Sequence, residues 1–278
     1  MKKISCSKII ETVSLLVSET SRVLPEEVKE LLKKSFFHED NALSRKYLGI
    51  ILENIEIAEK EKVPVCQDTG LAVFFVRQGA GVIVDTGEFP SLEDVINEGL
   101  RIGSRKGYLR NSVVDPVDRS NTKDNGPGII HFLEGRKEEF EISLIAKGFG
   151  SENTSALRMM SPTAGKEGVE CFIVDTVRNA GSLPCPPIFV GVGIGGSFEK
   201  AALLSKSALC NMGRDSRYRD WERQVLEKIN GLGIGAGGFG GRTTALDLRI
   251  ETFPTHIAGL PVAVNISCWA HRHGSVRL

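Results

Sequence analysis

The chain has 278 residues, which is enough for one large domain or two small ones, and a core of that size needs no disulfides. Its 35 Lys and Arg residues balance 35 Asp and Glu residues, which argues against nucleic acid or a membrane surface as the partner. No apolar run approaches the roughly 20 residues of a membrane span, and the basic N-terminus lacks the apolar stretch of a secretion signal. We therefore expect a soluble, cytoplasmic protein whose partner is a small molecule or another protein.

The first fifth of the chain is predicted to be helical. From about Ser7 to Lys62 apolar residues recur at spacings of three and four, and Pro25 suits the first turn of a helix. Between Leu71 and about Ile145, the short strand-like runs LAVFFVRQG and GIIHFLE alternate with turns and one helical segment, SLEDVINEGLRIGSRKGYL.

Glycine becomes frequent after residue 148, and the strand-like runs IFVGVGI and GLPVAVNIS lie there between predicted helices. No linker or internal repeat divides the chain. We therefore predict an α/β (mixed α+β) fold in one domain over residues 1–278. A helical N-terminal layer, residues 1–62, is followed by a glycine-rich α/β part with a mixed sheet, residues 63–278.

The glycine cluster GVGIGG raises the possibility of a nucleotide site. Gly191, Gly193 and Gly196 match the G-x-G-x-x-G pattern that binds dinucleotides between a strand and a helix. The pattern also needs an acidic residue about 20 positions later at the end of a second strand, whereas Asp215 falls in a predicted helix-and-loop region. A Rossmann-like nucleotide-binding protein remains an alternative, beside the simpler interpretation that these glycines form tight turns.

The six cysteines are too sparse for a disulfide scaffold, and cytosolic thiols stay reduced. Cys66, Cys185 and Cys268 lie next to turn-forming, proline-flanked or strand-end sequence. Cys171, at the start of a predicted strand, and Cys210, in a helical pattern, are interpreted as ordinary buried cysteines.

Three cysteines this far apart, with no C-x-x-C pair, do not fit zinc ribbons or ferredoxins, which need close ligand pairs. They suit a cluster assembled from distant loops. Three thiolates can hold a [4Fe–4S] cluster and leave one iron open to act as a Lewis acid. A non-catalytic partner subunit, with zinc or nothing at the cysteines, is a further possibility.

Sequence blocks around these cysteines resemble a known family, the iron–sulfur hydro-lyases, which comprise class I fumarases and L-tartrate dehydratases. Seven blocks occur in the family's order over nearly the whole chain: CQDTG (66–70), LRNS (109–112), AKGFGSENTS (146–155), LPCPP (183–187), GVGIGGSFEKAA (191–202), FPTHIAGLPVAV (253–264) and CWAHR (268–272). The chain ends shortly after CWAHR, so it resembles a separate α subunit. The resemblance implies that a β subunit supplies the rest of the active site, including the catalytic base.

The resemblance also implies roles for individual residues. Cys66, Cys185 and Cys268 would be the three ligands of a [4Fe–4S] cluster with one open iron. The substrate would be a four-carbon dicarboxylate, with fumarate hydration to (S)-malate as the main interpretation and L-tartrate dehydration as the alternative. The residues expected to contact that substrate are Gln67, Asp68, Arg110, Lys147, Gly148, Gly150 and His256. In the AKGFGS block, a phenylalanine stands where the family commonly has glycine.

The residue types agree with these roles. Dehydration must expel hydroxide, a poor leaving group, so a proton donor beside a Lewis acid is needed. Asp68, two residues from Cys66, is the candidate catalytic residue, although it also suits a cap of the QDTG turn. Arg110 can bind a carboxylate with two parallel hydrogen bonds. His271 and His273 are interpreted as tail residues without a role.

Overall fold

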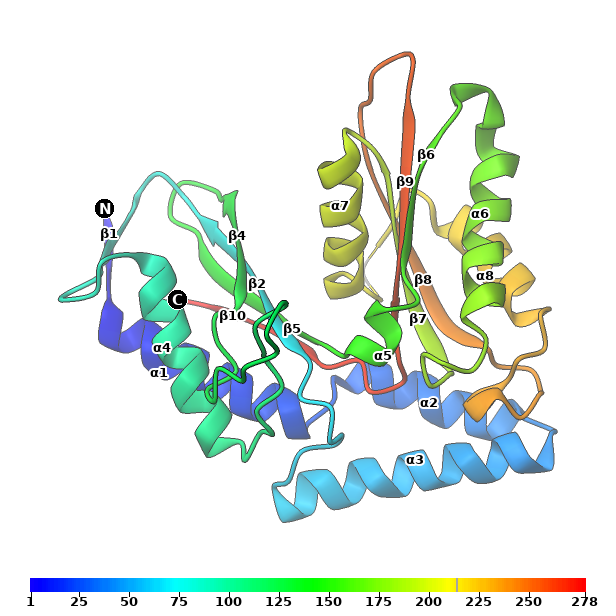
Figure 1. Cartoon of the computed structure of the whole chain (residues 1–278), viewed down its shortest axis with the longest axis horizontal. Coiled ribbons are helices and arrows are strands. Elements are labelled where there is room, and N and C mark those ends of the chain that lie inside the picture. The colour runs from blue at the N-terminus through cyan, green and yellow to red at the C-terminus, as the bar shows by residue number, and fades with distance from the viewer. Residues whose placement is uncertain (214) are drawn as a thin grey trace. The chain divides into compact units, whose positions relative to one another are not determined.

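The computed structural model describes residues 1–213 and 215–278, which form two compact units. Figure 1 shows the helices and strands of both units. Each unit is assembled from segments that are far apart in the sequence. The first unit contains Met1–Pro25, Asn54–Gly148 and Arg272–Leu278, and the second contains Glu26–Glu53 and Phe149–His271.

The first unit is built on a four-stranded sheet with the strand order β10-β5-β2-β4. β2 pairs in parallel with β4, and the other pairs are antiparallel, so the sheet is mixed. A two-stranded parallel sheet joins β1 to β3. The elements are β1 (Lys2–Ser5), α1 (Cys6–Arg22), β2 (Leu71–Gln78), β3 (Val82–Asp85), α4 (Leu92–Lys106), β4 (Ile129–Glu134), β5 (Phe140–Lys147) and β10 (His273–Arg277).

Helices α1 and α4 pack together and against this sheet. The α4 helix begins where the Ser91 hydroxyl accepts a hydrogen bond from the Asp94 amide, which is the usual N-cap interaction. A Cβ atom at Gly99 of α4 would lie 2.6 Å from the Cβ of Val13, and one at Gly103 would lie 2.7 Å from the Ser14 carbonyl oxygen. The two glycines therefore allow the helices to approach closely.

The second unit is built on a four-stranded mixed sheet with the order β6-β9-β7-β8. β7 runs parallel to β8 and antiparallel to β9, and β6 runs antiparallel to β9. The α3 helix belongs to this unit up to Glu53. The elements are α2 (Glu26–His38), α3 (Ala42–Glu61), α5 (Phe149–Glu152), β6 (Ala156–Met160), α6 (Gly165–Ala180), β7 (Ile188–Gly195), α7 (Phe198–Cys210), α8 (Arg219–Asn230), β8 (Ala245–Phe253) and β9 (Leu260–Ser267), with short 3₁₀ turns at Pro162–Ala164 and Ala236–Gly238.

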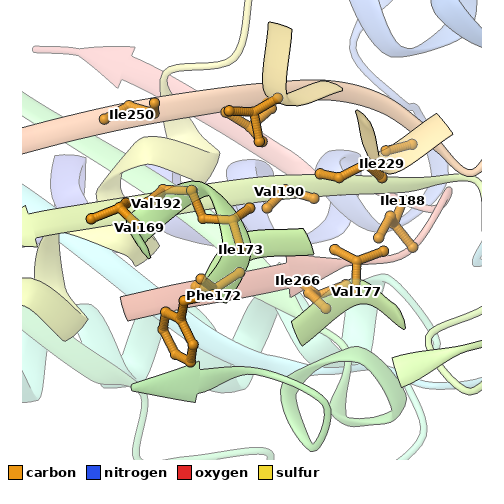
Figure 2. Close-up of a cluster of buried hydrophobic side chains, with 14 of the residues drawn as sticks. Val169, Phe172, Ile173, Val177, Ile188, Val190, Val192, Ile229, Ile250 and Ile266 are labelled. Atoms are coloured by element: carbon orange, nitrogen blue, oxygen red, sulfur yellow. The ribbon is translucent and has the colours of Figure 1, made fainter. Parts of the chain in front are cut away.

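The core of the second unit lies between the sheet and the helices α6 and α8. Figure 2 shows its buried side chains, among them Phe172, Ile173 and Val177 of α6, which meet Val190 and Val192 of β7. All five are at most 6 % exposed. Burying a side chain of this kind stabilises a fold by about 1.5–3 kcal/mol, so this layer holds the strands of the second unit in place.

The alternating sequence of β7 explains the glycines in GVGIGG. Successive residues of a strand point to opposite faces, so Val190 and Val192 face α6 and α8 while Gly191 and Gly193 face the other side. There α7 packs so closely that a Cβ at Gly191 would overlap the Ser205 carbonyl oxygen, and one at Gly193 would lie 2.6 Å from the Ser205 amide nitrogen. These two glycines are thus required by the packing of α7 on the sheet.

The predicted mixed α+β fold is confirmed, and the strands expected at IFVGVGI and GLPVAVNIS are present as β7 and β9. The N-terminal helices are divided between the units, with α1 in the first and α2 in the second. No helix in the described part of the chain is long and apolar enough to cross a membrane.

Two residue predictions were wrong. Cys171 lies in α6, not in a strand, and its side chain is exposed. The buried residues Val169, Phe172 and Val177 around it follow helical spacing, so Cys171 falls on the outer face of the helix. His271 is not a tail residue: it is fully buried, its ring stacks on Phe189 at 4.7 Å, and its nitrogens contact the Ser267 hydroxyl and a backbone carbonyl.

Candidate functional site

The CQDTG loop is fixed immediately before β2. The Asp68 Oδ1 accepts a hydrogen bond of 2.8 Å from the Gly70 amide, and the Thr69 hydroxyl donates to the Arg110 carbonyl oxygen at 2.6 Å. Gly70 has a φ of +73°, and a Cβ there would lie 2.8 Å from the Lys147 carbonyl carbon. Glycine is therefore required at this position, and Asp68 stabilises the turn through its Oδ1.

Arg110 and Gln67 lie side by side in the first unit. The Arg110 Nη1 donates a hydrogen bond of 3.1 Å to the Gln67 Oε1, and both side chains are exposed. The Arg110 backbone is tied to the Thr69 side chain, so the LRNS segment and the CQDTG loop are held together. The structure thus brings together two residues that the sequence predicts to bind the substrate.

Three more groups lie in this region, two at the end of β5 and one directly before β10. The Lys147 side chain is only 1 % exposed, and its ammonium group donates to the Gly148 carbonyl oxygen at 3.3 Å. A Cβ at Gly148 would lie 3.1 Å from the Asp68 Oδ2 and 3.8 Å from the Nη2 of Arg272. We call Asp68, Lys147, Gly148 and Arg272 the Asp68 cluster. Arg272 was not predicted from the sequence as a site residue, although it closes the CWAHR block.

In the second unit, Cys185 and Cys268 lie beside the same end of two paired strands, β7 and β9. Two residues separate Cys185 from the start of β7, and Cys268 directly follows β9. In the antiparallel register Phe189 pairs with Ser267, so the start of β7 is next to the end of β9. Cys185 has a φ of +54° and is exposed, and Cys268 is half-buried. The fold therefore places these two thiols at one end of two paired strands.

His256 lies at the opposite end of the same strands. It is exposed in the connection between β8 and β9, and its Nδ1 accepts a hydrogen bond from the Ala258 amide at 3.2 Å. The eight residues of β9 separate this connection from Cys268 (Figure 1), a length of about 25 Å at ~3.3 Å per residue. The structure does not bring His256 to Cys185 and Cys268. Gly150 lies in α5 and is exposed.

The donor set suits an iron–sulfur cluster in its chemistry. All six cysteines are thiols, and thiolates are the usual ligands of such clusters. Cys66, half-buried in its loop, belongs to the first unit, while Cys185 and Cys268 belong to the second. Within residues 1–213 and 215–278, no three His, Cys, Asp or Glu side chains form a group that could hold a metal ion.

The glycine clusters do not fit the nucleotide alternative. Gly191 and Gly193 lie inside β7, whereas the dinucleotide pattern needs them in the turn before a helix. The second cluster, at residues 231–241, is folded against Glu39, whose carboxylate accepts hydrogen bonds from the amides of Arg242 and Thr243. The two backbone amides that directly follow this glycine cluster thus already bind a carboxylate of the same chain.

Comparison with known proteins assigns the chain to a family. A family model described as fumarate hydratase (Fumerase) matches residues 10–277. A protein of Methanocaldococcus jannaschii named "Putative L(+)-tartrate dehydratase subunit alpha" is 42% identical over 98% of this chain and 98% of its own length. The L(+)-tartrate dehydratase subunit alpha of Escherichia coli K12 is 28% identical over 99% of this chain and 92% of its own length. Together with the chain-long match to the family model, these similarities establish that the chain belongs to the fumarate hydratase family of hydro-lyases.

Proposed function

We propose that the chain is the α subunit of an iron–sulfur-dependent hydro-lyase that works with a separate β subunit in the cytoplasm. Its first candidate reaction is the reversible hydration of fumarate to (S)-malate. The observation that best supports the proposal is the placement of Cys185 and Cys268 at one end of the paired strands β7 and β9. The chain that carries them matches the fumarate hydratase family model.

Cys66, Cys185 and Cys268 would hold a [4Fe–4S] cluster as thiolates. When bound, such a cluster supplies an iron without a protein ligand, which acts as a Lewis acid toward a hydroxyl or carboxylate oxygen. The positive φ of Cys185 and the strand end at Cys268 fit this role, because both thiols lie in connecting segments outside regular structure.

The residues of the first unit would handle the proton and the substrate charge. Asp68 is the candidate catalytic residue: the Gly70 amide holds its Oδ1, and the carboxyl group would give a proton to the departing hydroxyl or take one from water in the reverse reaction. General acid–base help of this kind is typically worth about 10²–10⁴-fold. Arg110, oriented by Gln67, would bind a substrate carboxylate, and Lys147 with the Gly148 backbone would complete the polar surface.

A second candidate substrate is L-tartrate. The relatives at 42% and 28% identity are both named as L(+)-tartrate dehydratase α subunits, one of them putatively. Tartrate differs from malate by one additional hydroxyl, and the residues named here bind carboxylates and a single leaving hydroxyl. Both substrates therefore fit the same carboxylate-binding groups, and an assay on both acids decides between them.

The proposal is tested by co-expressing the chain with its β partner, reconstituting the complex without oxygen, and assaying fumarate, (S)-malate and L-tartrate. We expect hydration or dehydration of at least one acid, little activity from the α chain alone, and a loss of about 10²-fold or more in Asp68→Asn. The matched control is Asp175→Asn, because Asp175 is an exposed carboxylate paired with Arg178 on α6. A complex that carries the cluster but converts none of the acids would contradict the proposal.

A further inference from the structure

We propose that Arg272 is a further substrate-binding residue, which binds one carboxylate of the dicarboxylate beside Asp68. This inference rests on the proposed function. Arg272 is only 2 % exposed, and its Nε has no hydrogen-bond partner in the part of the chain that the structure describes. Burying a charged donor without a partner costs folding free energy, so a ligand that supplies the acceptor explains why such a side chain is kept there.

The backbone fixes Arg272 beside the end of β5. Its carbonyl oxygen accepts a hydrogen bond of 3.0 Å from the Ala146 amide, one residue before Lys147. The next residue, His273, begins β10, which pairs antiparallel with β5. The position of Arg272 is therefore set by a sheet and does not depend on a surface loop.

A glycine stands beside both the guanidinium and the Asp68 carboxylate. The Arg272 Nη2 and the Asp68 Oδ2 both lie within 4 Å of the point where a Cβ of Gly148 would be. A guanidinium offers five N–H donors in a planar fork that matches a carboxylate. A carboxylate bound by the Arg272 guanidinium would therefore bring the adjoining carbon atoms of the same acid toward the Asp68 carboxylate.

The Asp68 cluster contains two cationic side chains. Arg272 and Lys147 are both buried cations, and Asp68 is the cluster's one carboxylate. Arg110, in the same unit, provides another guanidinium at an exposed position beside Gln67. Two arginines thus offer one cationic partner for each carboxylate of a four-carbon diacid.

Arg277 shows how an arginine with a structural partner looks in the same unit. It lies on β10, its side chain is 78% exposed, and its Nε donates to the Glu141 carboxylate at 2.6 Å. Arg277 therefore serves as the matched control, since it has the same side chain on a neighbouring stretch of backbone but an acceptor already in place.

The test compares Arg272→Lys, Arg272→Met and Arg277→Met in the reconstituted α–β complex. The first measurement is equilibrium binding of succinate, a four-carbon diacid that cannot lose water, and of butyrate, which has one carboxylate. We expect Arg272→Met to raise the Kd for succinate by about tenfold to a hundredfold, as expected for a lost charge-assisted hydrogen bond, and to lower the preference for succinate over butyrate. Arg272→Lys keeps the charge and should lose less, and Arg277→Met should bind as the wild type does.

Steady-state kinetics on the acid that the wild type converts provide the second measurement. KM should rise in the Arg272 variants by a factor similar to that in the succinate Kd, while the unfolding temperature of Arg272→Met should be no lower than that of the wild type. A wild-type complex that converts no acid argues against the proposed function. An active wild type whose Arg272→Met variant binds succinate within twofold of the wild-type Kd overturns the assignment of Arg272.

A structure of the wild-type complex with succinate decides the point if neither Arg272 variant assembles. A succinate carboxylate within hydrogen-bonding distance of the Arg272 guanidinium supports the assignment. A succinate bound with both carboxylates away from that guanidinium overturns it.

Discussion

Replacing Gly148 by alanine places a single methyl group between two of the groups proposed to act on the substrate. The added Cβ would lie 3.1 Å from the Asp68 Oδ2, whereas ordinary contacts of this kind begin at 3.4 Å. The carboxylate must then move by a few tenths of an ångström, against the 2.8 Å hydrogen bond that holds its other oxygen to the Gly70 amide. The same methyl would lie 3.8 Å from the Arg272 Nη2, which is an ordinary contact distance.

The expected loss of activity follows from that displacement. Misplacing a reacting group by about 1 Å can cost ~10²-fold in rate, so a shift of a few tenths lowers kcat by roughly three- to tenfold. We also expect KM to rise, because the methyl would lie beside the guanidinium that is proposed to bind a substrate carboxylate. The φ of Gly148 lies outside the left-handed region. Folding should therefore change little, with an unfolding temperature within about 3 °C of that of the wild type.

The assay is steady-state turnover of the reconstituted α–β complex, with circular dichroism to follow unfolding. Gly49→Ala is the control. Gly49 lies in α3 of the second unit, and a Cβ there would make an ordinary contact of 3.4 Å with the ring of Phe36 in α2. Wild-type kcat and KM in Gly148→Ala would refute the reasoning. So would a variant that loses activity only because it no longer folds.

Two further predictions concern the second unit. Gly193→Ala forces a Cβ to within 2.6 Å of the Ser205 amide nitrogen and should destabilise the fold by about 1–3 kcal/mol. Gly259→Ala is the control and should not destabilise the fold, because a Cβ at Gly259 would have no atom within 4 Å. Equal unfolding temperatures of the two variants in thermal denaturation would contradict this prediction. Burial raises the pKa of Glu170, but hydrogen bonds from Lys228 and Trp221 outweigh it and leave that pKa below its usual value. The stabilisation from the carboxylate is then present above the unfolded-state pKa and lost as pH falls through the lower folded-state value. Glu170→Gln should therefore be less stable than the wild type at pH 7, and the difference should shrink below about pH 4. A stability difference that does not change with pH in thermal denaturation would count against this prediction.

Several elements could be predicted from sequence because their signals are local. The α4 helix has an amphipathic pattern and a serine cap at Ser91, and β7 and β9 are apolar runs bounded by turn residues. The family resemblance, confirmed by the match over residues 10–277, follows from seven blocks in order. Local patterns and motif order were therefore enough for the fold class and the family.

Other features depended on contacts that no local pattern contains. The run CFIVDTV is rich in β-branched and aromatic residues, which favour strands. Only the longer spacing of Val169, Phe172 and Val177 shows that it is helical and that Cys171 faces outward. The glycines of GVGIGG resembled a phosphate-binding turn because the close packing of α7 on β7 imposes the same need for a missing side chain.

The site residues divide in the same way. Gln67, Asp68 and Arg110 were predicted from their blocks, and the structure places them in one unit. The burial of Arg272 depends on the pairing of β5 with β10, which joins segments more than a hundred residues apart in sequence. The position of His256 at the far end of β9 likewise follows from strand register, which motif order does not encode.

The most direct test of the account is the iron content of the anaerobically reconstituted α–β complex and of its cysteine variants. We predict about four iron atoms per α chain, as in one [4Fe–4S] cluster, in the wild type and in Cys171→Ser, whose thiol lies on the exposed face of α6. Serine at Cys66, Cys185 or Cys268 should remove iron and the visible absorbance together. Full iron content in any of those three variants, or a colourless wild-type complex, would contradict the assignment of the cluster ligands.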